Sequence, residues 1–283
     1  MKRPSRRHPL TIPILQAVLA GAAALLAVGA RAFGPEGHSI VAEIAQRRLS
    51  PAATARVSEL LGPNVSLASI ASWADDAREL RPETASWHFV NIPLRESAFA
   101  AQRHCRGALP ARGDCIVHAL ERMLAVLRDA HRPRPERAEA LMYVVHFVGD
   151  LHQPLHVVLE DRGGNAFPVR FPADPTRRRV VDTNLHQVWD YGLIRSLVWN
   201  WGAYVTRLEE GWLRRADSAV LRAGGIADWV NESHELAVRH VYAGVERDAT
   251  LGDDYIAQAT PLLDRQLGAA GLRLAALLND ALH

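Results

Sequence analysis

The chain contains 283 residues, of which 48% are hydrophobic and 23% are charged. These values exclude a disordered chain, a collagen-like repeat and a disulfide-dense mini-protein, and the length suffices for one large core or two small ones. The formal net charge of +2 suggests a basic nucleic-acid binder, but the basic excess lies at the start of the chain.

The first 32 residues have the pattern of a secretory signal peptide. Four Lys and Arg residues within the first seven precede a mostly apolar run from Leu10 to Val28, and Ala30-Arg31-Ala32 is typical of a cleavage site. We therefore expect residues 1–32 to be removed and the mature chain to begin at Phe33, in the periplasm or outside the cell, without a membrane-bound part. An uncleaved N-terminal anchor is the alternative. Cleavage removes five basic and no acidic residues, which changes the net charge from +2 to −3. Overall charge then no longer favours polyanions, so any nucleic-acid binding must be local or come from metal ions.

Hydrophobic periodicity predicts helices through most of the remaining chain. The predicted helices cover residues 39–49, 51–62, 115–128, 135–151, 197–213, 226–247 and 254–282. The tryptophans Trp199, Trp201, Trp212 and Trp229 lie at helical spacings, and we expect them in the core. The exception to helix is the segment 164–182, where two short strands, Asn165–Phe171 and Arg179–Val181, predict a β-hairpin. Because no repeat or linker interrupts the pattern, we expect one all-α domain over residues 33–283.

The two cysteines, Cys105 and Cys115, flank a loop that contains Gly and Pro residues. In the oxidising compartment that a signal peptide implies, we expect a disulfide between them. Two free buried thiols are the alternative.

Histidine is the most informative residue type, because the chain contains 13 of them. His146 and Asp150 are four residues apart within a predicted helix, and His186 and Asp190 have the same spacing. This spacing places an imidazole and a carboxylate on one helical face, where both can bind one ion. Four further candidates of the same types are His38, Asp75, His88 and His156. A single such pair is more often an ion pair, so the hypothesis of a metal site depends on the whole set.

Seven short motifs occur in an order that resembles a known family. They are Phe33-Gly34-Pro35-Glu36-Gly37-His38, Ser72-Trp73-Ala74-Asp75, Trp87-His88-Phe89-Val90-Asn91, His146-Phe147-Val148-Gly149-Asp150, Gln153-Pro154-Leu155-His156, Gly163-Gly164-Asn165 and Asn184-Leu185-His186-Gln187-Val188-Trp189-Asp190. The chain resembles the S1/P1 family of secreted zinc-dependent nucleases, whose fold is shared with bacterial zinc phospholipase C. The resemblance runs from Phe33 to about Ile194, and more loosely to the C-terminal helix.

The resemblance implies three zinc ions in a cleft between helices. The implied ligands are Asp75, His88 and His146 for the first zinc, His156, His186 and Asp190 for the second, and His38 with the α-amino nitrogen and carbonyl oxygen of Phe33 for the third, while Asp150 bridges the first and the third. His152 lies four residues before His156, and we expect it to lie behind the ligands or to be exposed. Signal cleavage is then needed for activity, since only cleavage before Phe33 creates the amine.

The resemblance also implies the reaction, which is hydrolysis of single-stranded DNA or RNA to 5′-phosphate products, with activity on 3′-nucleotides. Asp75 and Asp150 are the catalytic carboxylates, and Asp75 orients the attacking water. Arg78 offsets negative charge in the transition state, unless it only forms a surface ion pair. Phe89 and Asn91 match positions that stack on a base and hydrogen-bond to it, with core packing as the alternative for Phe89. The implied partners are nucleic acid and nucleotides, and we expect a monomer without a stable protein partner.

One residue departs from the family pattern, because the family usually begins with Trp and this chain has Phe33. Only backbone atoms of that residue bind metal, so we expect the third zinc to remain. Two other functions are left open by the sequence, namely a zinc-dependent phospholipase C of the same fold and a non-catalytic periplasmic zinc-binding protein.

Overall fold

The computed structural model describes residues 33–105 and 114–283. The expected signal peptide, residues 1–32, and the segment 106–113 between the cysteines lie outside the described residues. The α-helices are α1 Pro35–Gln46, α2 Pro51–Leu61, α3 Leu67–Ile70, α4 Trp73–Leu80, α5 Ala101–His104, α6 Ile116–Arg128, α7 Arg134–His152, α8 Leu185–Gln187, α9 Leu193–Leu197, α10 Trp201–Glu210, α11 Trp212–Arg215, α12 Ser218–Arg222, α13 Ile226–Leu236 and α14 Asp253–Ala281. The other elements are the 3₁₀ helices η1 Pro82–His88, η3 Pro154–Val157 and η4 Glu160–Arg162, the π-helices η5 Val188–Gly192 and η6 Ala237–Val241, and the strands β1 Pro168–Pro172 and β2 Val180–Asn184.

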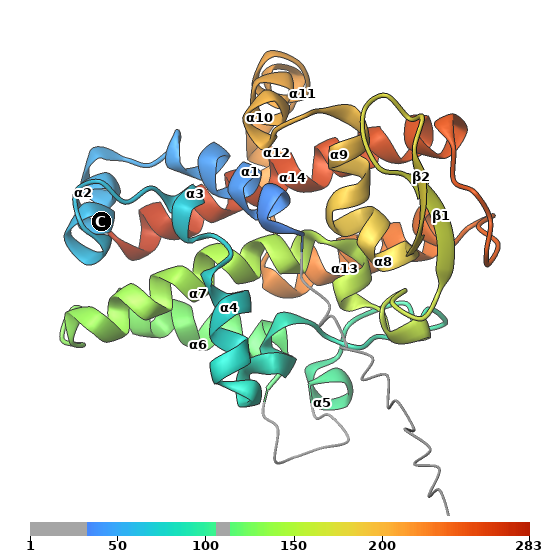
Figure 1. Cartoon of the computed structure of the whole chain (residues 1–283). Helices are drawn as coiled ribbons and strands as arrows, with labels where there is room; N and C mark the ends of the chain where they lie inside the picture. Colours follow the sequence, from blue (N-terminus) through green and yellow to red (C-terminus); the bar gives the residue numbers. More distant parts are fainter. Residues whose placement is uncertain (1–32, 106–113) are drawn as a thin grey trace, which may run out of the picture.

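Helix α7 lies at the centre of the molecule and packs against α1, α4, α6, α13 and α14 (Figure 1). All its residues from Tyr143 to His152 are buried. A helix that is covered on every side belongs to the interior, so any polar residue on it is also removed from water. His146 and Asp150 are therefore placed in the core by the helix that carries them.

The prediction of a mostly helical single domain is confirmed, with some boundaries moved. Helix α1 begins at Pro35 rather than at residue 39, because proline suits the first turn of a helix. As a result His38 lies within the first turns of this helix. Helix α2 matches its prediction, and the Ser50 side chain accepts a hydrogen bond from the Ala53 amide, as expected of a helix cap.

Two predicted long helices are interrupted. The segment 197–213 contains α10, which begins after the Asn200 cap, and a break at Gly211 (φ −103°, ψ −94°) separates it from α11. Trp199 precedes α10 and is 73% exposed, so the expectation that it belongs to the core is wrong. The segment 226–247 is helical only to Val241, and its last turn widens into a π-helix.

The hairpin is present but lies a few residues further along than predicted. β1 and β2 pair antiparallel, with Val169 opposite Thr183 and Phe171 opposite Val181. Val169 and Phe171 are buried while Arg170 between them is exposed, as the alternation of side chains along a strand requires. Residues 165–167 belong to the preceding turn instead of the first strand.

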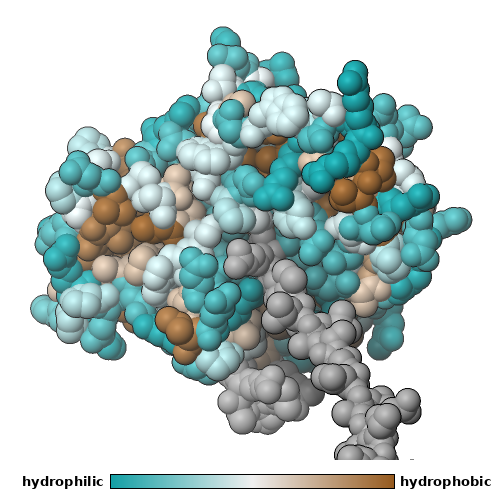
Figure 2. All heavy atoms as spheres, in the orientation of Figure 1, coloured by the Kyte–Doolittle hydropathy of each residue, from teal (hydrophilic) through white to brown (hydrophobic). Residues whose placement is uncertain are grey.

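The predicted disulfide between Cys105 and Cys115 is present, with 4.8 Å between the Cα atoms, so the alternative of two free thiols is wrong. In the face shown in Figure 2, hydrophilic side chains predominate and hydrophobic ones gather in separate patches. Among the described residues, no helix has both the length and the apolar character needed to span a membrane.

Candidate metal centre and substrate pocket

Eight side chains that the sequence selects as metal ligands converge in the interior. They come from α1, α4, η1, α7, η3, α8 and η5, and all eight are buried. They are His38, Asp75, His88, His146, Asp150, His156, His186 and Asp190. Burying so many ionisable groups is costly unless they are paired or bind cations, so this convergence itself indicates a function.

The first group of donor atoms surrounds Oδ2 of Asp150. This oxygen lies 3.0 Å from Nδ1 of His88 and 3.2 Å from Nε2 of His146, and the two nitrogens are 3.1 Å apart. Oδ1 of Asp75 completes the group at 3.8 Å from the His146 nitrogen and 3.9 Å from the His88 nitrogen. Ligand atoms that bind zinc at about 2.0–2.2 Å in a tetrahedron are separated by roughly 3.3–3.6 Å. The observed separations bracket this range.

The second group consists of His156, His186 and Asp190. Oδ2 of Asp190 lies 3.3 Å from Nε2 of His186, and Oδ1 lies 3.9 Å from Nε2 of His156. His186 is in α8 and Asp190 is in the π-helix η5 that follows directly, so the predicted four-residue spacing operates across a widened turn. Single π-turns of this kind are frequent at functional sites.

His38 faces the other carboxylate oxygen of Asp150. Its Nε2 is 3.3 Å from Oδ1 of Asp150, and its ring stacks on that of His146 at 4.0 Å between centroids. The close approach requires a glycine, because a Cβ at Gly149 would lie 2.6 Å from Nδ1 of His38. The two oxygens of Asp150 therefore face two different sets of donors, as a bridging ligand would.

Phe33 lies next to the same cluster. Its side chain is fully buried against Gly37, where a Cβ would come within 2.7 Å of the Phe33 Cβ. The following amide, that of Gly34, donates a hydrogen bond of 3.0 Å to the carbonyl oxygen of Asp190. This bond places the predicted first residue of the mature chain beside Asp190, which is a candidate ligand.

Backbone carbonyls orient three of the imidazoles. Nδ1 of His146 lies 2.8 Å from the Ala71 oxygen, Nδ1 of His156 lies 2.9 Å from the His88 oxygen, and Nδ1 of His186 lies 2.6 Å from the Gly163 oxygen. A carbonyl only accepts, so each Nδ1 carries the proton and donates it. In the neutral imidazoles of His156 and His186, Nε2 is then unprotonated and directed at Asp190, which is the arrangement that metal-binding histidines adopt.

Burial keeps most of these imidazoles neutral at pH 7. It lowers the pKa of His38 to about 4 and that of His186 to about 3, with a further lowering by the neighbouring His146 and His156 respectively. Burial also lowers the pKa of His156. Neutral imidazoles are the form that binds a metal, so little free energy is needed to deprotonate these three ligands.

The pKa values of His146, Asp150 and Asp190 are also shifted. Burial acts to lower the pKa of His146, but Asp150 and Asp75 outweigh it and raise the value to about 9. Burial likewise acts to raise the pKa of Asp150, but the imidazoles of His146, His38 and His88 hold it well below its usual range. For Asp190, burial outweighs the hydrogen bond from Gln153 and raises the pKa well above the usual value. A cation beside Asp190 would favour its charged form.

The donor atoms of this centre fit a metal. Nε2 of His38, His156 and His186 and Oδ1 of Asp150 are buried without a hydrogen-bond partner. Leaving buried polar atoms unpaired costs about 1–3 kcal/mol each, so a bound ion explains their arrangement better than a purely structural role. Three groups of these side chains have ligand atoms close enough to hold an ion, namely His38 with Asp75 and His146, His88 with His146 and Asp150, and His156 with His186 and Asp190.

Comparison with known proteins identifies the family. Residues 33–283 match the family described as S1/P1 Nuclease. The chain belongs to the S1/P1 nuclease family. It is 31% identical over 274 residues to Endonuclease 4 of Arabidopsis thaliana, with 89% of each chain covered. It is also 27% identical to Nuclease S1 of Aspergillus oryzae, with 96% of this chain and 97% of that one covered. Nuclease P1 of Penicillium citrinum is 32% identical over 64% of each chain.

A nuclease must admit nucleic acid to its active site. A pocket of about 440 Å³ opens beside the first and second groups of donor atoms. His88, His156 and His186 form its inner wall, and Phe89 and Asn91 lie on the same pocket. Phe89 is 37% exposed, so the alternative that it packs in the core is wrong. This pocket therefore has an aromatic face next to the candidate metal ligands.

Arg78 forms an ion pair and also lines the pocket. Its Nη2 lies 3.3 Å from Oδ1 of Asp75, and its side chain is 18% exposed and lines the pocket. It is three residues after Asp75 in the same short helix, α4, which places both side chains on one face. The Arg78 guanidinium is thus paired with Asp75 and also borders the pocket.

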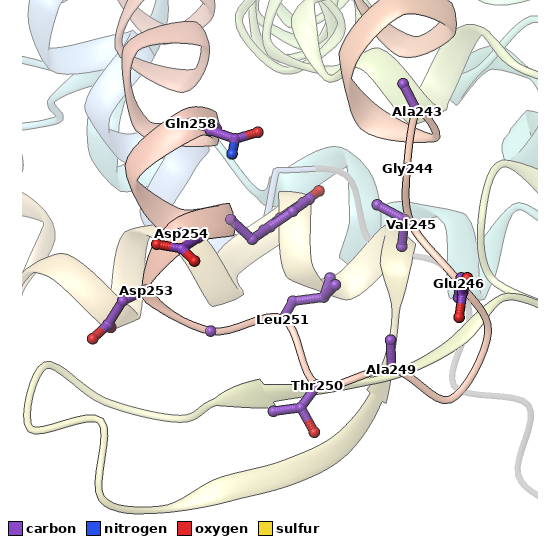
Figure 3. A pocket seen from close by; sticks show the side chains of 12 residues that line it. Ala243, Gly244, Val245, Glu246, Ala249, Thr250, Leu251, Asp253, Asp254 and Gln258 are labelled. Atoms are coloured by element: carbon purple, nitrogen blue, oxygen red, sulfur yellow. The ribbon is translucent and has the colours of Figure 1, made fainter.

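A larger hollow, of about 560 Å³, lies beside the start of α14 (Figure 3). It contains none of the candidate ligands and is lined by Glu246, Asp253 and Asp254. Because three carboxylates would repel a phosphodiester, the smaller pocket at the histidine cluster is the better substrate site.

Two supporting groups were not assigned a role from the sequence. Nε2 of Gln153 donates a 2.6 Å hydrogen bond to Oδ1 of Asp190, and the Gly163 oxygen orients His186. Both residues lie within the motifs of the sequence analysis, and this position was the signal that could have indicated their supporting roles. His152 is fully buried instead of exposed, and it faces away from the ligands, with Nδ1 donating to the Val148 oxygen and Nε2 accepting from Arg273.

We expect Gly163→Ala to weaken the second group of donors. Gly163 has φ +61°, and a Cβ there would lie 2.4 Å from the Leu155 carbonyl oxygen. The turn must move, so His186 loses its acceptor, and metal affinity at this group should fall by about 10–100-fold. Gly244→Ala is the matched control, because Gly244 has φ +72° but no atom within 4 Å of the added Cβ. Isothermal titration with zinc measures the difference, and equal losses in both variants would mean that only backbone strain matters.

Proposed function

We propose that this protein is a zinc-dependent nuclease that hydrolyses single-stranded DNA or RNA to 5′-phosphate products and also acts on 3′-nucleotides. The observation that carries the proposal is the convergence of eight buried His and Asp side chains beside a pocket with an exposed aromatic ring. We further propose that the enzyme is the domain of residues 33–283, released by signal cleavage into the periplasm or the medium, and that it works as a monomer.

Three zinc ions would be held by the side chains described above. The first would bind Asp75, His88 and His146, and the second would bind His156, His186 and Asp190. The third would bind His38 and the backbone of Phe33, with Asp150 shared between the first and third. When bound, zinc supplies a water of lowered pKa and positive charge for the phosphate oxygens. This local charge lets a mature chain of net charge −3 hold a polyanion.

The residues of the chain then have separate tasks. Asp75 accepts a hydrogen bond from the attacking water and orients it towards phosphorus. Arg78 donates to the non-bridging phosphate oxygens, where negative charge increases in the transition state. Because Arg78 is already held by Asp75 at 3.3 Å, little reorganisation is needed when the phosphate arrives.

Phe89 and Asn91 provide the binding of a base. An aromatic face stacks on any base, whereas the asparagine side chain can donate to a base edge and accept from it. A base can reach Phe89 only if it leaves the helical stack, which single strands allow at low cost. Preference for single strands thus follows from the position of the ring next to the ligand His88.

A substrate panel with and without a chelator tests this function against the alternatives. The processed protein should cleave single-stranded DNA, RNA and 3′-nucleotides, lose activity in the chelator and recover it with zinc. Cleavage of phosphatidylcholine alone would instead show a phospholipase C. Tight zinc binding without turnover of any substrate would show a zinc-binding protein.

We expect Phe89→Ala to raise KM for single-stranded substrates more than it lowers kcat. Stacking on one base contributes about 1–3 kcal/mol, so KM should rise by roughly 5–150-fold, and this binding is similar in ground and transition states. Trp199→Ala is the control, because Trp199 is another exposed aromatic residue but lies outside the pocket. Steady-state kinetics on an oligonucleotide measure both variants, and unchanged constants for Phe89→Ala would remove this ring from the substrate site.

A further inference from the structure

The turn that follows η3 has an unusual backbone. Asp161, Arg162, Gly163 and Gly164 all have positive φ, with values of 51°, 57°, 61° and 79°. Glycine adopts this conformation freely, but a left-handed helical conformation is unfavourable for residues that have a Cβ. Two consecutive residues with side chains in this region therefore indicate a conformation that the surrounding structure imposes.

The surrounding contacts hold the turn in place. Arg247 forms an ion pair with Asp161 and donates a 2.7 Å hydrogen bond to the Ala166 oxygen. The Tyr242 hydroxyl donates to the Glu160 oxygen at 3.0 Å. The Glu160 carboxylate accepts from the Leu94 amide, with 3.0 Å to each oxygen. Both of these carboxylates, which precede Arg162 directly in the sequence, are thus engaged with other partners.

The turn presents Arg162 to the substrate pocket. Arg162 lines the pocket together with Arg78 and is exposed. In the part of the chain that the structure describes, no aspartate or glutamate side chain lines this pocket, and the Arg162 guanidinium forms no ion pair. Arg78, in contrast, is paired with Asp75 among the metal ligands. The pocket therefore has one cation at the metal centre and a second, uncommitted one on the turn.

We propose that Arg162 binds a phosphodiester group adjacent to the one being hydrolysed, so that the site favours polynucleotides over substrates with a single phosphate. This proposal rests on the proposed nuclease function. A planar guanidinium matches two phosphate oxygens, and an anion is the partner that the unpaired cation lacks. The contacts made by Arg247 and Tyr242 offset the strain in the turn. The same conformation places the Gly163 oxygen at His186 and Arg162 on the substrate pocket.

The test compares substrates that differ in phosphate number. The zinc-loaded enzyme is assayed on a dinucleoside monophosphate, whose only phosphate is the cleaved one, and on a single-stranded oligonucleotide. Arg162→Gln should lower kcat/KM for the oligonucleotide by about tenfold and reduce the slope of log(kcat/KM) against log(salt) by about 0.7, the value for one phosphate contact on a single strand. For the dinucleotide, the change should stay within about twofold, because that substrate lacks a second phosphate.

Two further variants make the result specific. Arg162→Lys keeps the charge and should retain most of the salt dependence. Arg170→Gln removes an exposed arginine outside the pocket and should leave both substrates unaffected. Binding of a phosphorodithioate oligonucleotide, followed by fluorescence anisotropy, gives the same comparison without turnover.

The outcomes separate this proposal from the proposed function. If the wild-type enzyme cleaves neither substrate, the nuclease function fails. If it cleaves both and Arg162→Gln loses activity equally on each, or keeps the full salt slope, Arg162 does not bind a second phosphate. A loss that depends on the base while the slope is unchanged would assign Arg162 to base recognition and overturn the proposal.

Discussion

Asp150→Asn should remove nearly all turnover while the protein remains folded. The substitution is nearly isosteric, but it removes the negative charge between the His38 donor on one side and the His88 and His146 donors on the other. Removing one partner from a buried charged cluster costs about 3–5 kcal/mol, so zinc affinity at these positions and kcat/KM should fall by roughly two to four orders of magnitude. Native mass spectrometry counts the bound zinc, and circular dichroism shows whether the helices remain.

The control for Asp150→Asn is Asp264→Asn, which changes another buried aspartate. Asp264 accepts hydrogen bonds from Tyr204 and Arg207, outside the metal centre. It should lower the free energy of unfolding without changing the zinc content. Wild-type activity and full zinc content in Asp150→Asn would refute the bridging role.

The metal-free protein offers a second readout of the same residue. The pKa of His146 is about 9 in the folded protein and about 6.5 when unfolded, and Asp150 is a main cause of this increase. The stabilisation from a raised histidine pKa is fully present below pH 6.5 and is lost as the pH rises through about 9. The stability advantage of the chelated wild type over chelated Asp150→Asn should therefore decrease over this interval, as denaturant titrations at several pH values would show.

Part of the convergence of the candidate ligands was predictable from sequence, because some of them lie in motifs whose local geometry is nearly fixed. His146 and Asp150 are one helical turn apart, so any helix over that segment places them together. The sequence also predicted the disulfide and, among the helices that pack against α7, the helices α1, α6, α13 and α14. Asp75 and His88, however, lie in the short elements α4 and η1, which have too few turns to give a periodic signal. Their residue types made them candidates, but only the resemblance assigned them to a particular metal.

The supporting contacts could not be predicted, because they are made by backbone atoms or by side chains without a periodic pattern. The carbonyls of Ala71, His88 and Gly163 orient three imidazoles, and a carbonyl is present at every position of every sequence. The left-handed turn at Asp161 and Arg162 could not be predicted either, because its stabilising partner Arg247 is 86 residues away in the sequence. Tertiary contacts of this kind override local preferences and appear only in the folded structure.

The start of the mature chain should control the third metal. Phe33 is fully buried, and the Gly34 amide is fixed to the Asp190 carbonyl at 3.0 Å, so the first residue of a processed chain has a fixed position beside the cluster. A form that begins at Phe33 has an α-amino group there, which is a good nitrogen donor once deprotonated. One additional Met or Gly ahead of Phe33 converts this amine into an amide, which is a poor donor, and adds backbone at the metal position.

We therefore expect the extended form to bind about one zinc fewer per chain and to lose most phosphodiesterase activity, while it still folds, because the other two sites use only side chains. The processed form of Phe33→Leu is the matched control, since it keeps the amine and loses the ring. Its unfolding free energy should fall by about 1–3 kcal/mol from the lost packing against Gly37, but its zinc content should not change. Metal analysis and thermal unfolding of the three forms separate the two roles of this residue. If the extended form keeps all its zinc and cleaves as fast as the processed form, the N-terminal amine is not a ligand, and Phe33 contributes only its buried ring.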